Sequence, residues 1–115
     1  MMNEAGNRMN VGKTQWSLWL RRVWPALREV VAVAEFGALK YTPDGWWSNE
    51  LDEIETADAA IRHLLATISD VYIDAHGDVH IGQIDPESNL PHWAHAAWNV
   101  VAIGALRIKR QRGLP

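Results

Sequence analysis

Three stretches of this chain repeat apolar residues at helical spacing, and turns containing proline or glycine separate them. The first stretch follows Pro25, which loses no hydrogen bond in the first turn of a helix, and it predicts a helix over 26–41. The second stretch predicts a helix over about 49–69. The third opens at Pro91 and runs to about Arg110, ending in basic residues that suit a helix C-terminus. The pattern predicts an all-α fold, a small bundle of three to four helices.

The segments between these stretches contain turn, strand and loop signals. Polar and apolar residues alternate over 71–84, which predicts a short β-hairpin inserted into the bundle. Residues 85–91 are expected to form an irregular loop. Before the second helix, Ser48 is expected to be the N-cap residue. Residues 1–15 show little periodicity and predict a flexible leader. A single domain is then expected over 16–115.

Composition limits the classes of function. The 115 residues are 48% apolar and 22% charged, as in one ordinary globular domain, and the net charge of −3 argues against nucleic-acid binding. The chain has no cysteine, which excludes thiolate metal sites and cysteine nucleophiles. No run approaches the roughly 18 apolar residues of a membrane span, and the N-terminus lacks an apolar signal region. We therefore expect a cytoplasmic protein without membrane contacts.

Each predicted helix also carries polar residues that packing alone would not require. The residues that share or adjoin one helix face are Glu55, Asp58, Arg62 and His63 on the second helix, His92, His95 and Asn99 on the third, and Glu29, Glu35, Phe36 and Lys40 on the first. Carboxylates bind hard divalent cations, whereas Arg, Lys and His complement phosphate oxygens. If the three faces converge, they predict a cleft for a metal–phosphate ligand, meaning a nucleotide or a pyrophosphate.

These residues also have purely structural interpretations. The acids could form a solvated helix face, and His63 could be a buried histidine with satisfied hydrogen bonds. The pair His92 and His95 could bind zinc, but a spacing of three residues without a third ligand supports this only weakly. Most of the seven tryptophans are expected in the core or in subunit contacts, and Trp46 is the candidate for stacking on a ligand.

The order of several sequence blocks resembles a known family. The blocks are Leu27-Arg-Glu-Val-Val, Glu35-Phe-Gly-Ala-Leu-Lys-Tyr41, Trp46, Asp58-Ala-Ala-Ile-Arg-His63 and Asp85-Pro-Glu-Ser-Asn-Leu-Pro-His-Trp-Ala-His-Ala-Ala-Trp-Asn99. Together they resemble the phage-encoded dATP/dGTP diphosphohydrolases, which are grouped with the MazG-like, all-α nucleoside-triphosphate pyrophosphohydrolases. The resemblance covers about residues 13 to 107, and its last block is the most specific.

The resemblance implies an enzyme that cleaves a purine deoxynucleoside triphosphate to monophosphate and pyrophosphate with Mg²⁺ or Mn²⁺. It implies metal binding by Glu35, Glu55 and Asp58, and catalysis by Glu35, Asp58, Arg62 and His63. The residues expected to bind substrate are Lys40, Trp46, His92, His95 and Asn99.

Two positions depart from the family pattern. Ala32 stands where MazG-like enzymes carry a further acid, so Glu29, Asp85 or Glu87 would have to supply the missing oxygen. Asn89 replaces the usual glycine of the Asp-Pro-Glu-Ser-Gly loop, and asparagine also tolerates a left-handed backbone. The substitution at Ala32 keeps open a non-catalytic alternative, a purine-nucleotide-binding or structural phage protein. In either case, the tryptophan-rich surface and the resemblance predict a homodimer or homotetramer.

Overall fold

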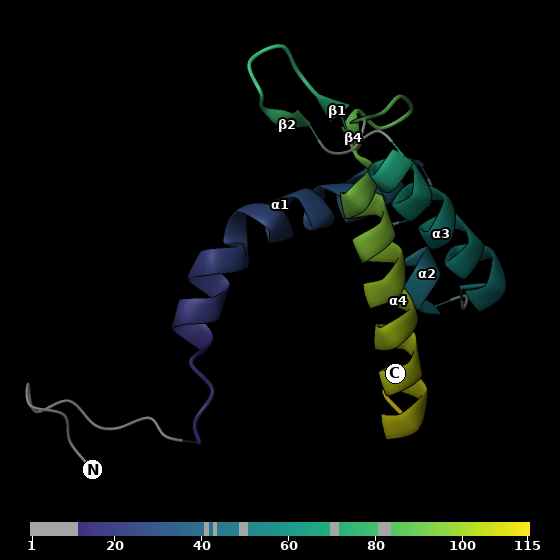
Figure 1. Ribbon diagram of the computed structural model, residues 1–115. Coiled ribbons are helices and arrows are strands. Elements are labelled where there is room, and N and C mark those ends of the chain that lie inside the picture. Colours follow the sequence, from purple (N-terminus) through teal and green to yellow (C-terminus); the bar gives the residue numbers. More distant parts are fainter. Residues whose placement is uncertain (1–11, 41, 43, 49–50, 70–71, 81–83) are drawn as a thin grey trace, which may run out of the picture.

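The computed structural model describes residues 12–40, 42, 44–48, 51–69, 72–80 and 84–115. Its helices are α1 (Trp16–Lys40), α2 (Gly45–Ser48), α3 (Glu53–Ser69) and α4 (His92–Arg112) (Figure 1). Two short antiparallel strand pairs join them: β1 (Tyr72–Ile73) with β2 (Val79–His80), and β3 (Ile84–Asp85) with β4 (Leu90–Pro91). The predicted all-α bundle with a hairpin insertion is confirmed. In the described part of the chain, no helix is long and apolar enough to cross a membrane.

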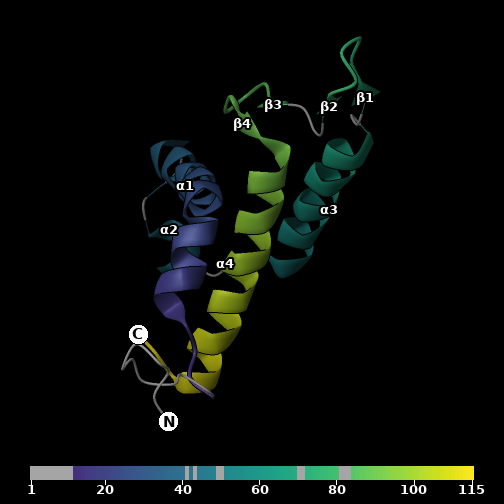
Figure 2. The same cartoon turned by 60° about the vertical axis from the view of Figure 1, so that its left-hand side comes forward.

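Helix α4 lies between α1 and α3 and packs against both (Figure 2). Its buried face is made largely of small residues, which allow the helix axes to approach closely; they are Ala94, Ala96 and Ala102, with Leu106 near the C-terminal end. Val33 from α1 and Ala60 from α3 complete this narrow core. His95 is buried on the same helix, so a polar ring lies inside the apolar contact.

Two connections hold the start of α3 and the short α2 to the end of α4. Glu53 accepts hydrogen bonds from Arg107 at 3.2 Å and from Arg110 at 2.7 Å. These two bonds, Arg110 first, lower the pKa of the Glu53 carboxyl. The indole Nε1 of Trp47 donates to the Pro115 carbonyl at 3.0 Å. Residues in the last turns of α4 and just after it therefore contact the elements that flank the cavity described below.

The first helix is longer than predicted, and this boundary prediction was wrong. It begins at Trp16 rather than after Pro25, so the proline lies inside the helix. An internal proline removes one helical hydrogen bond and bends the helix, and α1 changes direction along its length in Figure 1. The helix continues N-terminal to Pro25 because Trp16, Trp19, Leu20 and Val23 keep a helical repeat there.

The predicted cap of the second helix was also wrong. The cap of α3 is Asp52, whose Oδ1 accepts hydrogen bonds from the backbone N–H groups of Ile54 and Glu55, both at 3.0 Å. Ser48 belongs instead to α2, a single turn of helix where only a turn was expected. Residues 49–50 of the predicted helix lie outside the described residues, and α3 itself begins at Glu53.

The hairpin predicted over 71–84 is confirmed by the pairing of β1 with β2. Residues 71 and 81–83 of this prediction lie outside the described residues, and Ile84 belongs to β3. The irregular loop predicted over 85–91 was wrong, because Asp85 and Leu90 are paired across a second, tight hairpin. Asn89 has a φ of 59° in this turn, the left-handed conformation that its side chain was expected to allow. The turn brings the acid-rich segment after Ile84 back onto the start of α4.

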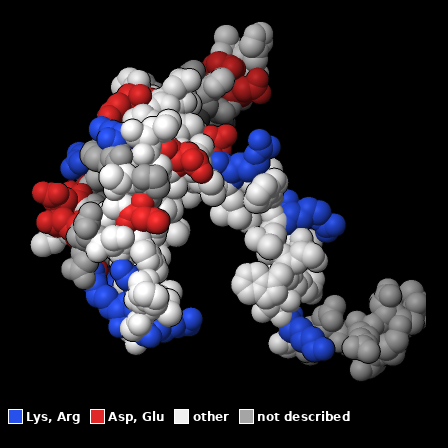
Figure 3. Space-filling view, turned by 180° about the vertical axis from the view of Figure 1, so that it is seen from behind, with Lys and Arg blue, Asp and Glu red and all other residues white. Residues whose placement is uncertain are grey.

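The N-terminal half of α1 projects away from the bundle as an arm, and a wide gap separates the two (Figure 3). Its large apolar side chains are exposed, among them Trp16 at 69% and Trp19 at 59%. The leader predicted over 1–15 falls mostly outside the described residues, and the domain boundary at residue 16 stays a prediction.

Candidate functional site

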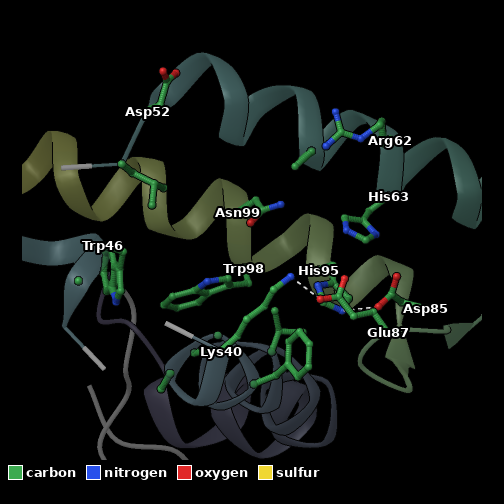
Figure 4. A pocket seen from close by; sticks show the side chains of 18 of the residues that line it. Lys40, Trp46, Asp52, Arg62, His63, Asp85, Glu87, His95, Trp98 and Asn99 are labelled. Atoms are coloured by element: carbon green, nitrogen blue, oxygen red, sulfur yellow. Dashed lines mark hydrogen bonds and ion pairs between the residues drawn. The ribbon is translucent and has the colours of Figure 1, made fainter. Parts of the chain in front are cut away.

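A cavity of about 690 Å³ opens between α1, α3, α4 and the β3–β4 turn. This volume is in the range of pockets that bind small molecules. Six of the residues predicted from the sequence line it: Lys40, Trp46, Arg62, His63, His95 and Asn99 (Figure 4). The three predicted helix faces therefore converge in part, and none of Glu35, Glu55 and Asp58 lines this cavity.

One end of the cavity is aromatic. Trp46 on α2 contacts Trp98 on α4 edge to face, with ring centroids 5.2 Å apart and an interplanar angle of 80°. Figure 4 shows these two rings at the end opposite the histidines. Trp98 was not singled out in the sequence, although it lies one residue before Asn99 on the same helix. Flat indole surfaces can take up a planar, uncharged group such as a nucleobase.

The opposite end is lined by His63 and His95, and His92 contacts His63 just outside the cavity. The rings of His63 and His95 are stacked, with centroids 4.5 Å apart and an interplanar angle of 13°. The Nδ1 atoms of His63 and His92 are 2.8 Å apart. Burial lowers the pKa of both His63 and His95, and repulsion from the neighbouring imidazoles lowers that of His63 further. These rings are therefore kept neutral more readily than exposed histidines.

Ser88 links this cluster to Asp85. The Ser88 hydroxyl donates to Asp85 Oδ2 at 2.9 Å and lies 2.6 Å from His95 Nε2, so His95 donates to Ser88 as its Nε2–H tautomer. Burial opposes ionisation of Asp85, but the hydrogen bonds from the backbone and hydroxyl of Ser88 lower the pKa of this carboxyl. Because the serine proton is directed to Asp85 rather than to a histidine, the trio is not a nucleophilic triad. It holds the turn in place.

An ion pair crosses the cavity wall between α1 and the β3–β4 turn. The Lys40 ammonium contacts Glu87, and both side chains are substantially exposed. Exposed pairs of this kind contribute little to stability, so phosphate oxygens can compete with Glu87 for the lysine. The sequence predicts Asp85 and Glu87 as loop-capping acids or as substitutes for a missing metal ligand, and it does not predict the contact of Glu87 with Lys40.

The predicted metal ligands are divided. Glu55 and Asp58 line a second cavity of about 560 Å³, and Arg62 and Asn99 line both cavities, so the two adjoin. Glu35 is exposed and lines neither cavity, although the other residues from Val33 to Ala38 all line the first. Glu35 therefore faces away from the cavity, on the outer side of α1. It does not line the second cavity with Glu55 and Asp58.

His92 also lies beside the cavity rather than in its wall; it is joined to the site through His63. Ser88, like Trp98, belongs to the site but was not predicted as a site residue, although it is the serine of the Asp-Pro-Glu-Ser block. Its role depends on the tight β3–β4 turn, which the residue order alone did not indicate.

The fold and the cavity together define a class: a small all-α protein whose cavity has indole rings at one end and imidazole and charged side chains at the other. The family is given by a family model for "dATP/dGTP diphosphohydrolase, N-terminal", which matches residues 3–113. The match covers nearly the whole chain, and the protein belongs to this family. No curated protein and no solved structure matches the chain.

Proposed function

We propose that this protein hydrolyses dATP or dGTP to the deoxynucleoside monophosphate and pyrophosphate, with Mg²⁺ or Mn²⁺ as cofactor. One observation carries the proposal: a single cavity has an indole pair at one end and cationic and imidazole side chains at the other. A purine base would lie against Trp46 and Trp98, and the phosphates would extend toward Arg62, Lys40 and the histidines. The family match supports the same substrate class.

The metal is proposed at Glu55 and Asp58. Both acids line the adjoining cavity, and Mg²⁺ in phosphate-processing sites is commonly held by one or two carboxylates together with substrate oxygens. The two acids therefore fit the cofactor without Glu35, which this proposal leaves outside the metal site. When bound, the ion would neutralise phosphate charge and make a bound water more acidic.

The protein's own residues would bind and orient the phosphates. Arg62 lies where the two cavities meet, so its guanidinium can hold phosphate oxygens beside the carboxylates. Lys40 would exchange Glu87 for a phosphate oxygen. The lowered pKa of His63 and His95 favours neutral rings. Such rings would contact the phosphates through hydrogen bonds, and Arg62 and Lys40 would supply the positive charge. A carboxylate of the Glu55–Asp58 pair would take the proton of the attacking water.

Asp58→Asn tests this assignment. It removes one carboxylate charge while keeping the size of an exposed side chain. We expect turnover of dGTP and dATP to fall by at least a hundredfold, with the far-UV circular dichroism spectrum and the unfolding temperature unchanged.

Asp78→Asn, in the β1–β2 turn, is the matched control and is expected to keep full activity. Wild-type turnover in Asp58→Asn would contradict the metal assignment. Equal losses in both variants would contradict it as well.

A second candidate function is supported by the small number of acids at the site. Ala32 and the outward placement of Glu35 leave two carboxylates at the second cavity where the family pattern has more. A protein that binds the nucleotide without cleaving it would have the same indole pair and cations. Tight binding of dGTP without release of pyrophosphate would favour this candidate.

A homo-oligomer is proposed alongside either function. The apolar stripe of the α1 arm, defined here as Trp16, Trp19, Leu20 and Val23, is exposed along its length. Stripes at this spacing usually pack against another helix. A second copy of the chain is the partner that we propose for it.

A further inference from the structure

Three potential metal ligands meet beside the cavity, and they come from three different elements. His63 lies on α3, Asp85 on β3 and His92 at the start of α4. Each offers one ligand atom, and these atoms all lie within 4.8 Å of one another. All three residues are partly buried. This cluster is separate from the carboxylates of the second cavity.

The two imidazoles already face each other through the same type of atom. Their Nδ1 atoms are 2.8 Å apart, so one Nδ1–H donates to the lone pair of the other Nδ1, and both nitrogens face the space between the rings. In the tautomer that carries its hydrogen on Nε2, the donor ring would also direct an Nδ1 lone pair into that space. A tetrahedral ion with bonds of about 2.1 Å to nitrogen separates two such ligands by about 3.4 Å. Small rotations of the two rings would therefore open the position that an ion needs.

Neighbouring residues orient two of the three ligands. The ring of His63 is stacked on His95, and the carboxylate of Asp85 is fixed by hydrogen bonds from the Ser88 N–H and hydroxyl, both at 2.9 Å. Both bonds end on Oδ2 of Asp85. Metal-binding side chains are typically held in this way by groups that do not touch the metal.

We propose that His63, Asp85 and His92 bind a transition-metal ion of the Zn²⁺ class. Two imidazoles and one carboxylate form a three-ligand set with an open position, as in catalytic zinc sites. Imidazole nitrogens favour first-row transition metals over Mg²⁺, which prefers oxygen ligands. His63 and Asp85 line the cavity, so the open position faces the end with the histidines and acids. The inference stands on this geometry and does not depend on the proposed hydrolysis.

The test is a titration of the chelator-treated full chain with Zn²⁺, followed by calorimetry, in the absence of nucleotide. We expect one ion to bind per chain, a rise in the unfolding temperature on Zn²⁺ addition, and no displacement by millimolar Mg²⁺. His63→Gln and His92→Gln should each weaken Zn²⁺ binding by at least tenfold. His76→Gln, in the exposed β1–β2 turn, is the matched control and should bind as the wild type does.

A measurement on the wild-type chain guards against variants that fail to fold. The imidazole nitrogen resonances of ¹⁵N-labelled protein should shift on Zn²⁺ addition at His63 and His92 and stay unchanged at His76. Absence of Zn²⁺ binding, or binding that shifts neither His63 nor His92, would overturn the proposal. If the wild-type protein binds Zn²⁺ at this cluster but hydrolyses neither dATP nor dGTP, the proposed function is contradicted and the Zn²⁺ site is not.

Discussion

At the scale of single residues, the site depends on histidines that stay neutral. Burial lowers the pKa of His63 and His95 below the ordinary histidine value of about 6.5. The nearby Asp85 carboxylate partly opposes this effect by attracting the charged form of each ring. Neutral rings allow the stack of His63 on His95 and the Nε2–H bond from His95 to Ser88.

The lowered values predict how stability depends on pH. As the pH falls below about 6.5, the unfolded chain takes up protons on these histidines before the folded chain does, so unfolding becomes more favourable. The stabilisation is therefore complete above this pH and is lost as the pH falls through the lowered folded-state values. We expect the unfolding temperature to decrease from pH 7.5 to pH 5.5, measured by circular dichroism in one buffer system.

His63→Gln should reduce this dependence, because the variant lacks one of the two titrating rings. The exposed His76 provides the comparison, and His76→Gln should keep the wild-type slope. An unfolding temperature that stays constant over this range would contradict the assignment of neutral histidines. Asp85 adds a further loss only at more acidic pH, because its pKa is also lowered.

Residue spacing predicted which residues share one face of a helix, but it did not predict which face of α1 lines the cavity. Glu55, Asp58 and Arg62 share a cavity because their spacing of three and four residues puts them on one face of α3. Glu35 precedes Phe36 by one residue and so lies about 100° around the helix from it. Which side of α1 faces the cavity is decided by packing against α4, and spacing within α1 does not determine it.

At the scale of elements, α3 depends on the cap that Asp52 provides. Its carboxylate satisfies two backbone N–H groups that the first helical turn leaves without partners. Asp52→Ala should lower the free energy of unfolding by about 1 kcal/mol. In a domain of this size, this corresponds to a decrease of about 4 °C in the unfolding temperature.

Thermal unfolding followed by circular dichroism would measure this effect. Asp78→Ala removes another exposed aspartate that caps no helix and should change the unfolding temperature by less than about 1 °C. A neutral result for Asp52→Ala would show that α3 does not depend on this cap. Restoring an oxygen acceptor in Asp52→Ser should recover most of the loss.

The two errors in helix starts share one physical cause. Local signals favoured Pro25 and Ser48 as helix starts, since each is a good residue for that position. The apolar repeat before Pro25 outweighs the hydrogen bond that the proline removes, and Asp52 lies closer to the apolar stripe than Ser48 does. The β3–β4 pairing contains only two residues in each strand, and a strand that short has no readable alternation.

At the scale of the whole molecule, the described chain leaves much apolar surface exposed. The core around α4 consists mainly of alanines, whereas the large side chains of the α1 arm remain in contact with solvent. The arm stands apart from the bundle in Figure 3. We expect light scattering at micromolar concentration to give two or four times the single-chain mass of 13.0 kDa.

The double variant Trp16→Ser with Trp19→Ser should shift the mass toward the monomer. Leu114→Ser, which changes an exposed leucine at the C-terminal end, should leave the mass unchanged. A wild-type monomer would contradict the proposed oligomer. An oligomer that survives the double variant would contradict the role of the α1 arm.

The central claim is the cleavage of a purine deoxynucleoside triphosphate in the cavity between α1, α3 and α4. Its most direct test is product analysis after incubation of the purified protein with dATP or dGTP and Mg²⁺ or Mn²⁺. Equal amounts of monophosphate and pyrophosphate are the predicted products. Release of orthophosphate together with the deoxynucleoside diphosphate would contradict the claim. The absence of any product with either nucleotide would contradict it as well.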